Sequence, residues 1–254
     1  MIRIGIIGYR RHASKHIALL RKNNNVSDLR IYHPSNKSSE ITNNFEDLIE
    51  SDGIIISSPT FTHCDYIQEL ADRKFTGGIY VEKPGFSSLK ELEILRELLV
   101  HNERINLMIG YHYPFTKKIK AVKNIMNKLD TGTILMISIS SAKGIAYKDS
   151  FKYDWRAKDT LAISHTLLSH QISIYQEIIG PNLKLEEKEL NIRVYQNPEN
   201  KFYCTGLVSS IGRTPILHGF SSWGSPYSEL KITIACTNCK IELNGGSLRV
   251  CAPR

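Results

Sequence analysis

The run Gly53-Ile54-Ile55-Ile56-Ser57 restricts the possible folds more than any other segment of this chain. Three consecutive isoleucines make a strand that is apolar on both faces, and such strands occur inside parallel sheets that helices cover on both sides. Other β-rich runs lie at 3–7, 29–32, 78–81 and 105–109, and helical patterns separate them. This alternation predicts βαβ units and an α/β fold with a doubly wound parallel sheet of Rossmann type.

The helices between these strands carry their own signals. Ala13, Ile17 and Leu20 recur at i, i+4 and i+7, as on one face of a helix. Ser88 and Glu91 form an S-x-x-E capping box, which predicts that a helix begins after Ser88.

The pattern changes after about residue 130. Residues 133–140 predict a strand, and residues 164–179 predict one long helix that Gly180-Pro181 ends. Alternating runs follow, with turn residues between several of them, at 185–195, 202–211, 215–222, 228–235, 239–243 and 247–251. Strands without intervening helices predict an antiparallel meander. We therefore expect a Rossmann domain over 1–115 and an α+β domain with a mainly antiparallel sheet over 116–254.

Length, composition and charge favour some classes of protein and partner over others. The 254 residues suffice for two modest domains, and no apolar run approaches the ~20 residues that span a bilayer. The N-terminus enters a strand directly and leaves no room for a signal peptide, and the five scattered cysteines favour a reducing compartment, so we expect a cytoplasmic protein. The net charge of +8 favours an anionic partner. Basic residues do not interleave with aromatic ones, which favours a phosphate-bearing small molecule over nucleic acid.

Gly8 lies between the first strand and the first helix, where a turn that binds a dinucleotide belongs. The N-terminus of the helix offers N–H groups and a positive dipole end to a pyrophosphate. Arg10 and Ala13 occupy the second and third glycine positions of the G-x-G-x-x-G pattern. Alanine is accepted there, whereas Arg10 must point away or bind phosphate through its guanidinium. A simple strand-to-helix turn is the alternative interpretation.

The second predicted strand ends without the Asp or Glu that binds a ribose 2′-hydroxyl. His33, Ser35 and Lys37 stand there instead. Lys37, Ser35 and Arg10 could bind a 2′-phosphate, so the sequence favours NADP over NAD. A polar surface loop without this role is the alternative.

Two further segments, Ser57-Ser58-Pro59-Thr60-Phe61-Thr62-His63 and Val81-Glu82-Lys83-Pro84, carry a specific resemblance. With the Gly8–His16 opening and Gly110-Tyr111-His112-Tyr113-Pro114-Phe115, they resemble the Gfo/Idh/MocA family of NAD(P)-dependent oxidoreductases. The resemblance implies that Glu82 contacts the ribose beside the nicotinamide and that Pro84 shapes the turn, with a cis bond as one way of doing so. The cofactor-binding residues that we expect are Gly8, Tyr9, Arg10, Arg11, His12, Ala13, His33, Ser35, Lys37, Ser57, Ser58, Pro59, Thr60, His63, Glu82, Lys83, Pro84 and His112.

The predicted helix at 164–179 has a polar stripe, Thr166, His170, Ser173 and Glu177, and an apolar stripe, Leu168, Ile172, Tyr175 and Ile179. By pattern alone this is an amphipathic helix with a solvent-facing polar side. The resemblance instead makes His170 a general acid/base, and it places Thr166 where the family has a catalytic Asp. Lys83, at the carboxyl end of a strand, is the other expected catalytic residue. The expected substrate-binding residues are Lys83, Tyr113, Arg156, Thr166 and His170, and a surface salt bridge is an equal alternative for Arg156.

The resemblance implies hydride transfer to or from a hydroxyl or carbonyl carbon of a sugar, sugar nucleotide or related small molecule. It also implies a homo-oligomer formed through the C-terminal sheet. A catalytically reduced sensor or scaffold that binds NAD(P) is the alternative. Thr166 in place of Asp, Pro114 in place of Arg and a chain that ends early for the family, at Arg254, favour that alternative.

Cys236 and Cys239 form a lone C-x-x-C. A zinc site needs four convergent ligands, and the sequence has no second such pair, so we expect no metal. The sequence favours cysteines that serve as small buried hydrophobic residues.

Overall fold

The computed structural model describes residues 1–35, 38–147, 164–180, 193–196, 203–209, 215–223, 225 and 227–252. The chain forms two compact units, Met1–Tyr111 and His112–Arg254. In the described part of the chain, no helix is long and apolar enough to cross a membrane.

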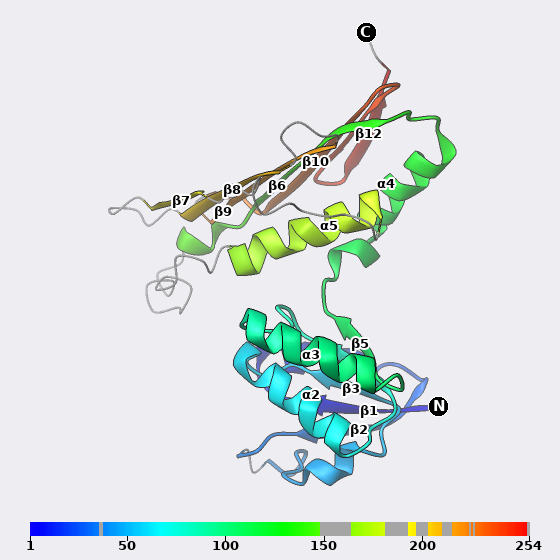
Figure 1. Cartoon of the computed structure of the whole chain (residues 1–254), viewed down its shortest axis with the longest axis vertical. Coiled ribbons are helices and arrows are strands. Elements are labelled where there is room, and N and C mark those ends of the chain that lie inside the picture. The colour runs from blue at the N-terminus through cyan, green and yellow to red at the C-terminus, as the bar shows by residue number, and fades with distance from the viewer. Residues whose placement is uncertain are drawn as a thin grey trace. The chain divides into compact units, whose positions relative to one another are not determined.

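The N-terminal unit contains a five-stranded parallel sheet (Figure 1). Its strand order is β2-β1-β3-β4-β5. The strands are β1 (Ile2–Ile7), β2 (Val26–Tyr32), β3 (Gly53–Ile56), β4 (Gly78–Val81) and β5 (Asn106–Ile109). The order reverses between β1 and β3, and ligands of open α/β sheets bind beyond the carboxyl ends of strands at such a point.

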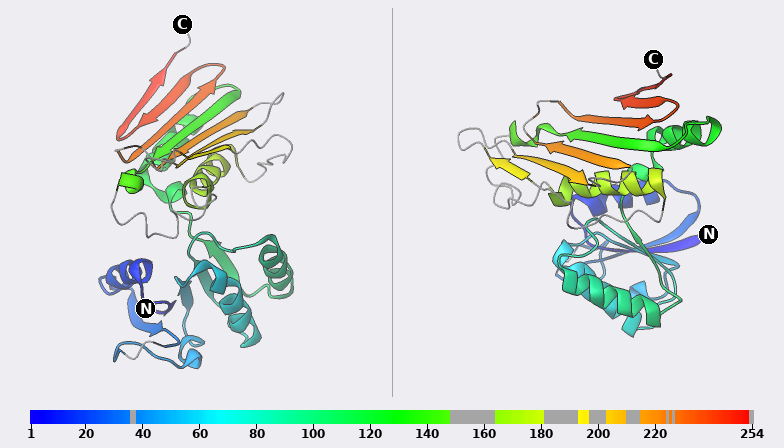
Figure 2. Two further views of the ribbon diagram at one scale, coloured as in Figure 1. Left: turned by 90° about the vertical axis from the view of Figure 1, so that its left-hand side faces the viewer. Right: turned by 45° about the horizontal axis from the view of Figure 1, so that its top comes forward.

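Helices cover both faces of this sheet (Figure 2). Helix α1 (Arg11–Leu20) lies on one side, while α2 (His63–Asp72) and α3 (Leu89–His101) lie side by side on the other. Ile54 and Ile56 are fully buried in a core with residues of α2 and α3. The predicted doubly wound sheet is confirmed.

The capping box at the start of α3 is also confirmed. The Ser88 hydroxyl accepts a hydrogen bond from the Glu91 N–H at 3.2 Å. The Glu91 carboxylate reaches back and accepts a hydrogen bond from the Ser87 N–H at 2.6 Å. The first bond satisfies a backbone donor that the first helical turn leaves without a partner, and the second connects Glu91 to the residue before the cap.

The C-terminal unit contains a seven-stranded sheet in the order β12-β11-β10-β6-β9-β8-β7. Its strands are β6 (Ile134–Ala142), β7 (Arg193–Gln196), β8 (Tyr203–Ser209), β9 (Ile216–Ser222), β10 (Glu229–Cys236), β11 (Lys240–Asn244) and β12 (Ser247–Cys251). Helices α4 (Lys117–Lys128) and α5 (Ser169–Ile179) lie against one face of the sheet (Figure 1). Ile119, Ile137, Ile174 and Ile234 form part of the core between helices and sheet.

The predicted mainly antiparallel sheet is confirmed, but the prediction of a simple meander is wrong at one place. Strand β6 pairs antiparallel with β10 on one side and parallel with β9 on the other. The two antiparallel runs, β7-β8-β9 and β10-β11-β12, therefore flank β6. Local alternation cannot reveal this, because β6 lies far from both partners in the sequence.

The prediction of one long helix over 164–179 is correct at its end and incomplete at its start. Residues Ser164–Leu168 form a π-helical turn (η7) before α5 begins. The helix ends at Gly180, whose φ is +109°. The pattern-based alternative of a solvent-facing stripe holds only in part, because His170 and Ser173 are buried whereas Thr166 and Glu177 are partly exposed.

Gly8 gives a direct test of the N-terminal unit. Its φ is +113°, and an added Cβ would lie 2.7 Å from the carbonyl oxygen of Ser57. We expect Gly8→Ala to lower the free energy of unfolding by about 1–3 kcal/mol, since both the left-handed backbone and the contact oppose a side chain. Urea unfolding measures the change.

Gly78→Ala is the matched control, because a Cβ at Gly78 would meet nothing within 4 Å. It should change the free energy of unfolding by less than about 1 kcal/mol. Equal effects of the two substitutions would contradict this account of the Gly8 turn.

Candidate active site

The loops at the carboxyl edge of the five-stranded sheet are hydrogen-bonded to the strands beside them. The Ser57 N–H donates to the carbonyl of Ile7 at 2.8 Å, and the Glu82 N–H donates to that of Ile56 at 2.8 Å. The parallel ladder thus continues one residue beyond the ends of β3 and β4. The loop that begins at Gly8 and the loops that begin at Ser57 and Glu82 consequently start side by side.

The Gly8 turn leads into an open helix N-terminus. Arg10 is the N-cap residue of α1 with extended backbone, and no side chain caps the helix there. Its first turn contains no acidic residue, which favours an anion at the N-terminus of the helix. Ala13 is fully buried and faces the core, whereas Arg10 is exposed. Tyr9 packs against the same core as Ala13.

The loop after β2 has internal hydrogen bonds of its own. His33 Nδ1 accepts from the Ser35 N–H at 3.2 Å, and the Asn43 side-chain amide donates to the His33 carbonyl at 2.5 Å. Residues 33–35 present no carboxylate. Lys37 lies outside the described residues, as does the side chain of Arg11.

Glu82 lies in a small cluster with two histidines of α1. Its Oε1 is 2.8 Å from His16 Nε2 and 4.0 Å from His12 Nδ1. Burial acts to raise the pKa of Glu82, but the hydrogen bond with His16 and the charges of His12 and His16 outweigh it, so the pKa is lowered. The side chain is therefore held as a carboxylate at neutral pH.

Our sequence analysis did not assign His16 to the site. His16 follows His12 by four residues, so both rings lie on one side of α1. This spacing could have placed His16 in the site. The ring of His16 also makes an edge contact with Tyr80 of β4, with the ring centroids 5.5 Å apart. The pairing with Glu82 spans 66 residues and has no local signature.

The next two residues complete the loop after β4. Lys83 is half-buried. The Lys83–Pro84 peptide bond is cis, which is one of the ways in which we expected Pro84 to shape the turn. Roles for Lys83 in cofactor or substrate binding stay predictions.

His63 connects two of the loops. The ring is buried, with Nε2 3.0 Å from the carbonyl oxygen of Ser58 and Nδ1 3.1 Å from that of Pro84. The Thr62 hydroxyl, next to it, donates to the hydroxyl of Ser58 at 2.7 Å. His63 therefore fixes the loop after β3 against the loop after β4. A direct contact of His63 with a cofactor stays a prediction.

Pro59 and Thr60 lie between these anchoring residues. Pro59 is exposed and precedes a short 3-10 helix, Thr60–Thr62. Both therefore lie at the surface end of the loop after β3, beyond Ser58.

In the C-terminal unit, three aromatic rings pack together. The ring centroid of His170 is 5.0 Å from that of His112 and 4.9 Å from that of Tyr113, both in edge-on arrangements. His112 and Tyr113 stack at 4.5 Å. Burial raises the pKa of Tyr113. The structure thus brings together three residues that we assigned to cofactor or substrate.

Gln171, which follows His170, holds α5 on the sheet and was not assigned by sequence. It is almost fully buried, and its amide nitrogen donates to the hydroxyls of Ser141 at 2.8 Å and Ser221 at 3.0 Å. The same nitrogen lies 2.8 Å from the carbonyl oxygen of Phe220. Thr166 lies in the preceding π-helical turn, and Arg156 lies outside the described residues.

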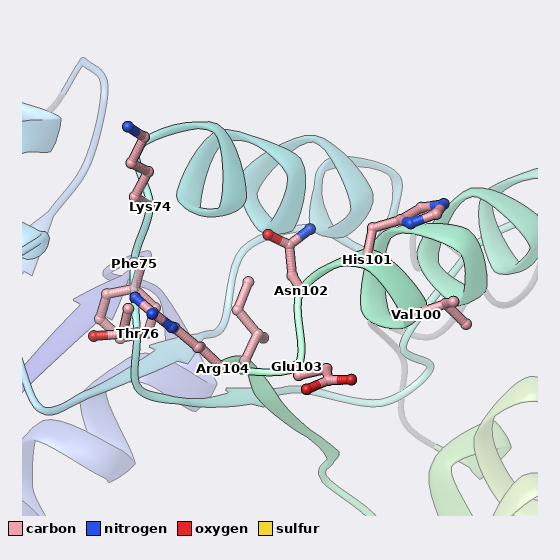
Figure 3. Close-up of a pocket in the computed structure, with 9 residues that line it drawn as sticks. Lys74, Phe75, Thr76, Val100, His101, Asn102, Glu103 and Arg104 are labelled. Carbon is pink, nitrogen blue, oxygen red and sulfur yellow. The ribbon is translucent and has the colours of Figure 1, made fainter.

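A pocket of about 540 Å³ lies elsewhere in the N-terminal unit (Figure 3). It is lined by residues that precede β4 and β5, among them Thr76 and Ile105, and by the end of α3. These positions mark the amino ends of the strands, the opposite edge from the loops described above. The pocket is therefore separate from the candidate site.

Comparison with known proteins agrees with this geometry. Residues 2–111 match the GFO/IDH/MocA model, the oxidoreductase family with an NAD-binding Rossmann fold. The match covers the N-terminal unit, and the family resemblance predicted from the sequence is confirmed there. The chain is also 31% identical over 120 residues to the uncharacterised oxidoreductase YrbE of Bacillus subtilis, a match covering 46% of this chain and 34% of YrbE. The matched segment thus spans about a third of that relative.

Solved structures of similar fold cover nearly the whole chain. An oxidoreductase from Agrobacterium radiobacter, solved with NAD+, L-tartaric acid and magnesium, has a TM-score of 0.82 at 18% identity over 99% of this chain and 77% of that one. The UDP-N-acetylglucosamine 3-dehydrogenase GnnA from Acidithiobacillus ferrooxidans has a TM-score of 0.76 at 13% identity over 98% and 79%. At these identities the similarity establishes the fold of both units.

The buried ring of His63 predicts a loss of stability in mild acid. Burial lowers its pKa below the ordinary 6.5, so the unfolded chain binds a proton more readily than the folded one as the pH falls below that value. The free energy of unfolding should therefore decrease as the pH falls from about 7.5 to 5. His63→Gln should reduce this dependence, as urea unfolding across the range measures.

His101→Gln is the control, because His101 is exposed at the end of α3. It should leave the pH dependence unchanged. If the slope in His63→Gln equals that of the wild type, the buried ring does not cause the acid sensitivity.

Proposed function

We propose that this protein is an NAD(P)-dependent oxidoreductase. In this proposal it transfers a hydride to or from a hydroxyl or carbonyl carbon of a sugar, sugar nucleotide or related small molecule. The observation that carries the proposal is the arrangement at the carboxyl edge of the parallel sheet. There the Gly8 turn lies beside the loop that begins at Ser57, and His16 of the uncapped α1 contacts Glu82 in the loop of Glu82, Lys83 and Pro84.

The residues at this edge fit a dinucleotide. Gly8 approaches the Ser57 carbonyl so closely that a side chain would fill the space, and the N-terminus of α1 presents N–H groups to a pyrophosphate. Glu82, held as a carboxylate by His16, can accept hydrogen bonds from ribose hydroxyls. The bound nicotinamide would supply the hydride acceptor or donor.

Two side chains are proposed to handle the proton. Lys83 would hold or polarise the reacting hydroxyl of the substrate. His170 would act as general acid/base, packed edge-on against His112 and Tyr113 so that its ring has a defined orientation. Arg156, Thr166 and Tyr113 are the further residues that we propose for substrate binding. Sugar-type substrates are favoured because one protein of similar fold is a UDP-N-acetylglucosamine 3-dehydrogenase.

Assembly through the C-terminal sheet is part of the proposal. Helices α4 and α5 cover one face, whereas Ile216 and Phe220 on β9 are 42% and 40% exposed on the other. An apolar surface of this kind favours contact with a second copy of the chain. The odd number and wide spread of the five cysteines favour a reducing compartment such as the cytoplasm.

A catalytically reduced protein that senses or presents the cofactor is the second candidate. Thr166 favours it, since a threonine hydroxyl cannot shuttle a proton at neutral pH where the family has a carboxylate.

Cofactor preference follows from the loop after β2. Without a carboxylate at His33 or Ser35, and with Lys37 in the same loop and Arg10 at the start of α1, we expect NADP(H) to bind more tightly than NAD(H). Lys37→Glu should weaken NADP(H) about 10–100-fold through lost charge attraction and leave NAD(H) nearly unchanged. Fluorescence titration at fixed salt measures both affinities.

Lys22→Glu provides the same charge change at an exposed position just after α1. It should not alter the ratio of the two affinities. Equal or reversed affinities in the wild type would refute the assignment of NADP.

Catalysis depends on Lys83 and His170 in this proposal. Lys83→Ala and His170→Ala should each reduce turnover about 10²–10⁴-fold, the usual contribution of a positioned acid or base. His170→Ala should leave cofactor affinity almost unchanged. If both residues serve one proton transfer, the double variant should be scarcely slower than the slower single variant, as steady-state kinetics would show.

The two candidate functions give different results in this experiment. A wild-type chain that binds cofactor tightly but turns over no member of a broad sugar panel would support the sensor, and Thr166→Asp would then test whether a carboxylate restores activity. Full activity in Lys83→Ala would show that the catalytic residue lies elsewhere.

A further inference from the structure

We propose that Cys236 and Cys239 form a reversible dithiol–disulfide pair at the end of the β10–β11 hairpin. The proposed oxidoreductase function does not use this C-x-x-C, and the inference does not depend on that function. It concerns a modification site whose partner is a small-molecule disulfide, such as glutathione disulfide.

The two cysteines lie directly opposite each other across the hairpin. Ala235 pairs with Lys240, and one step further the Cys236 N–H donates to the Cys239 carbonyl at 2.9 Å. Only Thr237 and Asn238 separate them. Hydrogen-bonded residues of an antiparallel pair have Cα atoms about 5.5 Å apart and side chains on the same face. A disulfide spans Cα separations of about 4.4–6.8 Å, so the separation typical of such a pair lies within this range, and closing the bond requires the Cβ atoms to approach to about 3.5–4.5 Å.

The side chains occupy one region of the core on the inner face of the sheet. Both residues are buried to the same extent, and they belong to one cluster with Ile234 and Ile241. Burial raises the pKa of the Cys236 thiol, and the adjacent Cys239 thiol raises it further, while the Thr131 hydroxyl lowers it. The influence of one thiol on the other is consistent with sulfur atoms that lie side by side.

The loop before β6 fixes the turn that carries them. The N–H groups of Thr237 and Asn238 donate to the carbonyls of Thr133 at 3.0 Å and Thr131 at 3.1 Å. In return, the Thr133 N–H donates to the Thr237 hydroxyl at 3.0 Å. The conformational entropy of bringing the two thiols together is therefore lost on folding, before any disulfide forms. Their effective concentration should be higher in the folded than in the unfolded chain.

The other described cysteines lack this arrangement. Cys251 pairs with Lys240, one residue after Cys239, and neighbouring positions of a strand point to opposite faces. Cys64 belongs to the core of the N-terminal unit. Cys204 lies on β8, which β9 and β6 separate from β10.

The reaction is a pair of thiol–disulfide exchanges. A thiolate of one cysteine attacks a sulfur of the small disulfide, which forms a mixed disulfide and releases one thiol. The second cysteine then attacks the protein sulfur, closes the Cys236–Cys239 bond and releases the second thiol. The two cysteines lose two electrons and two protons, and the external disulfide gains them. Because burial raises the pKa of Cys236, the first step should be slow while the closed product is favoured at equilibrium.

Redox equilibration of the reduced full-length chain tests the proposal. The protein would be held in glutathione redox buffers, quenched with acid and alkylated, and the peptide containing Cys236 and Cys239 analysed by mass spectrometry. We expect an intramolecular disulfide whose equilibrium constant is at least about tenfold higher in the folded chain than in the same chain in urea. Cys64 should remain a thiol in the folded protein. An equal or smaller constant in the folded chain would overturn the proposal.

Two variants and a melting experiment support this measurement. Cys239→Ser should abolish the intramolecular bond, whereas the matched variant Cys251→Ser should leave it unchanged. By thermodynamic linkage, the oxidised wild-type chain should melt at a higher temperature than the reduced one, and this comparison needs no variant. A lower or equal melting temperature would refute the proposal.

Discussion

The hydrogen bonds that continue the parallel ladder beyond the strand ends are the constraint on which the candidate site depends. The Gly8 N–H donates to the Tyr32 carbonyl, and the Gly110 N–H to the Val81 carbonyl. Ser57 and Glu82 make the equivalent bonds to β1 and β3. Each loop consequently leaves the sheet at a position that its neighbour determines. Gly8 is required because the loop after β3 passes within van der Waals distance of the turn, which leaves no room for a side chain.

Polar side chains then fix the loops relative to one another. His16 links α1 to Glu82, and His63 links the loop after β3 to the loop after β4. A neutral imidazole can donate from only one nitrogen, yet both nitrogens of His63 lie near carbonyl oxygens. In the neutral ring, the protonated nitrogen therefore donates a hydrogen bond to one carbonyl oxygen. The other nitrogen carries no proton and lies close to the second carbonyl oxygen without a hydrogen bond. Such a group contributes to geometry more than to stability, because a buried polar atom without a full partner is costly.

The sequence predicted the features that depend on local pattern. The isoleucines of β3, the turn at Gly8 and the cap at Ser88 are each encoded within a few residues, and all were correct. Features that depend on distant partners were missed or wrong. The parallel pairing of β6 with β9 joins segments about 80 residues apart, and the His16–Glu82 pair joins residues 66 apart. Helix α4 was not assigned either, although Thr116 caps it by accepting from the Ile119 N–H.

Helix α5 shows how a polar residue outside the predicted polar stripe determines where the stripe lies. Gln171 is buried because the sheet beneath it supplies hydroxyl groups from Ser141 and Ser221, which lie close to each other where β6 and β9 run in parallel. The parallel pairing, which the sequence pattern did not predict, thus brings together the two hydroxyl groups that bind the Gln171 amide. Since successive helical residues are about 100° apart, anchoring Gln171 on the sheet also determines the direction of His170. The π-helical turn at Ser164–Leu168 changes the rotation of the chain just before this anchor. The pairing of β6 and β9 thus fixes the residue next to His170, whose ring packs against His112 and Tyr113.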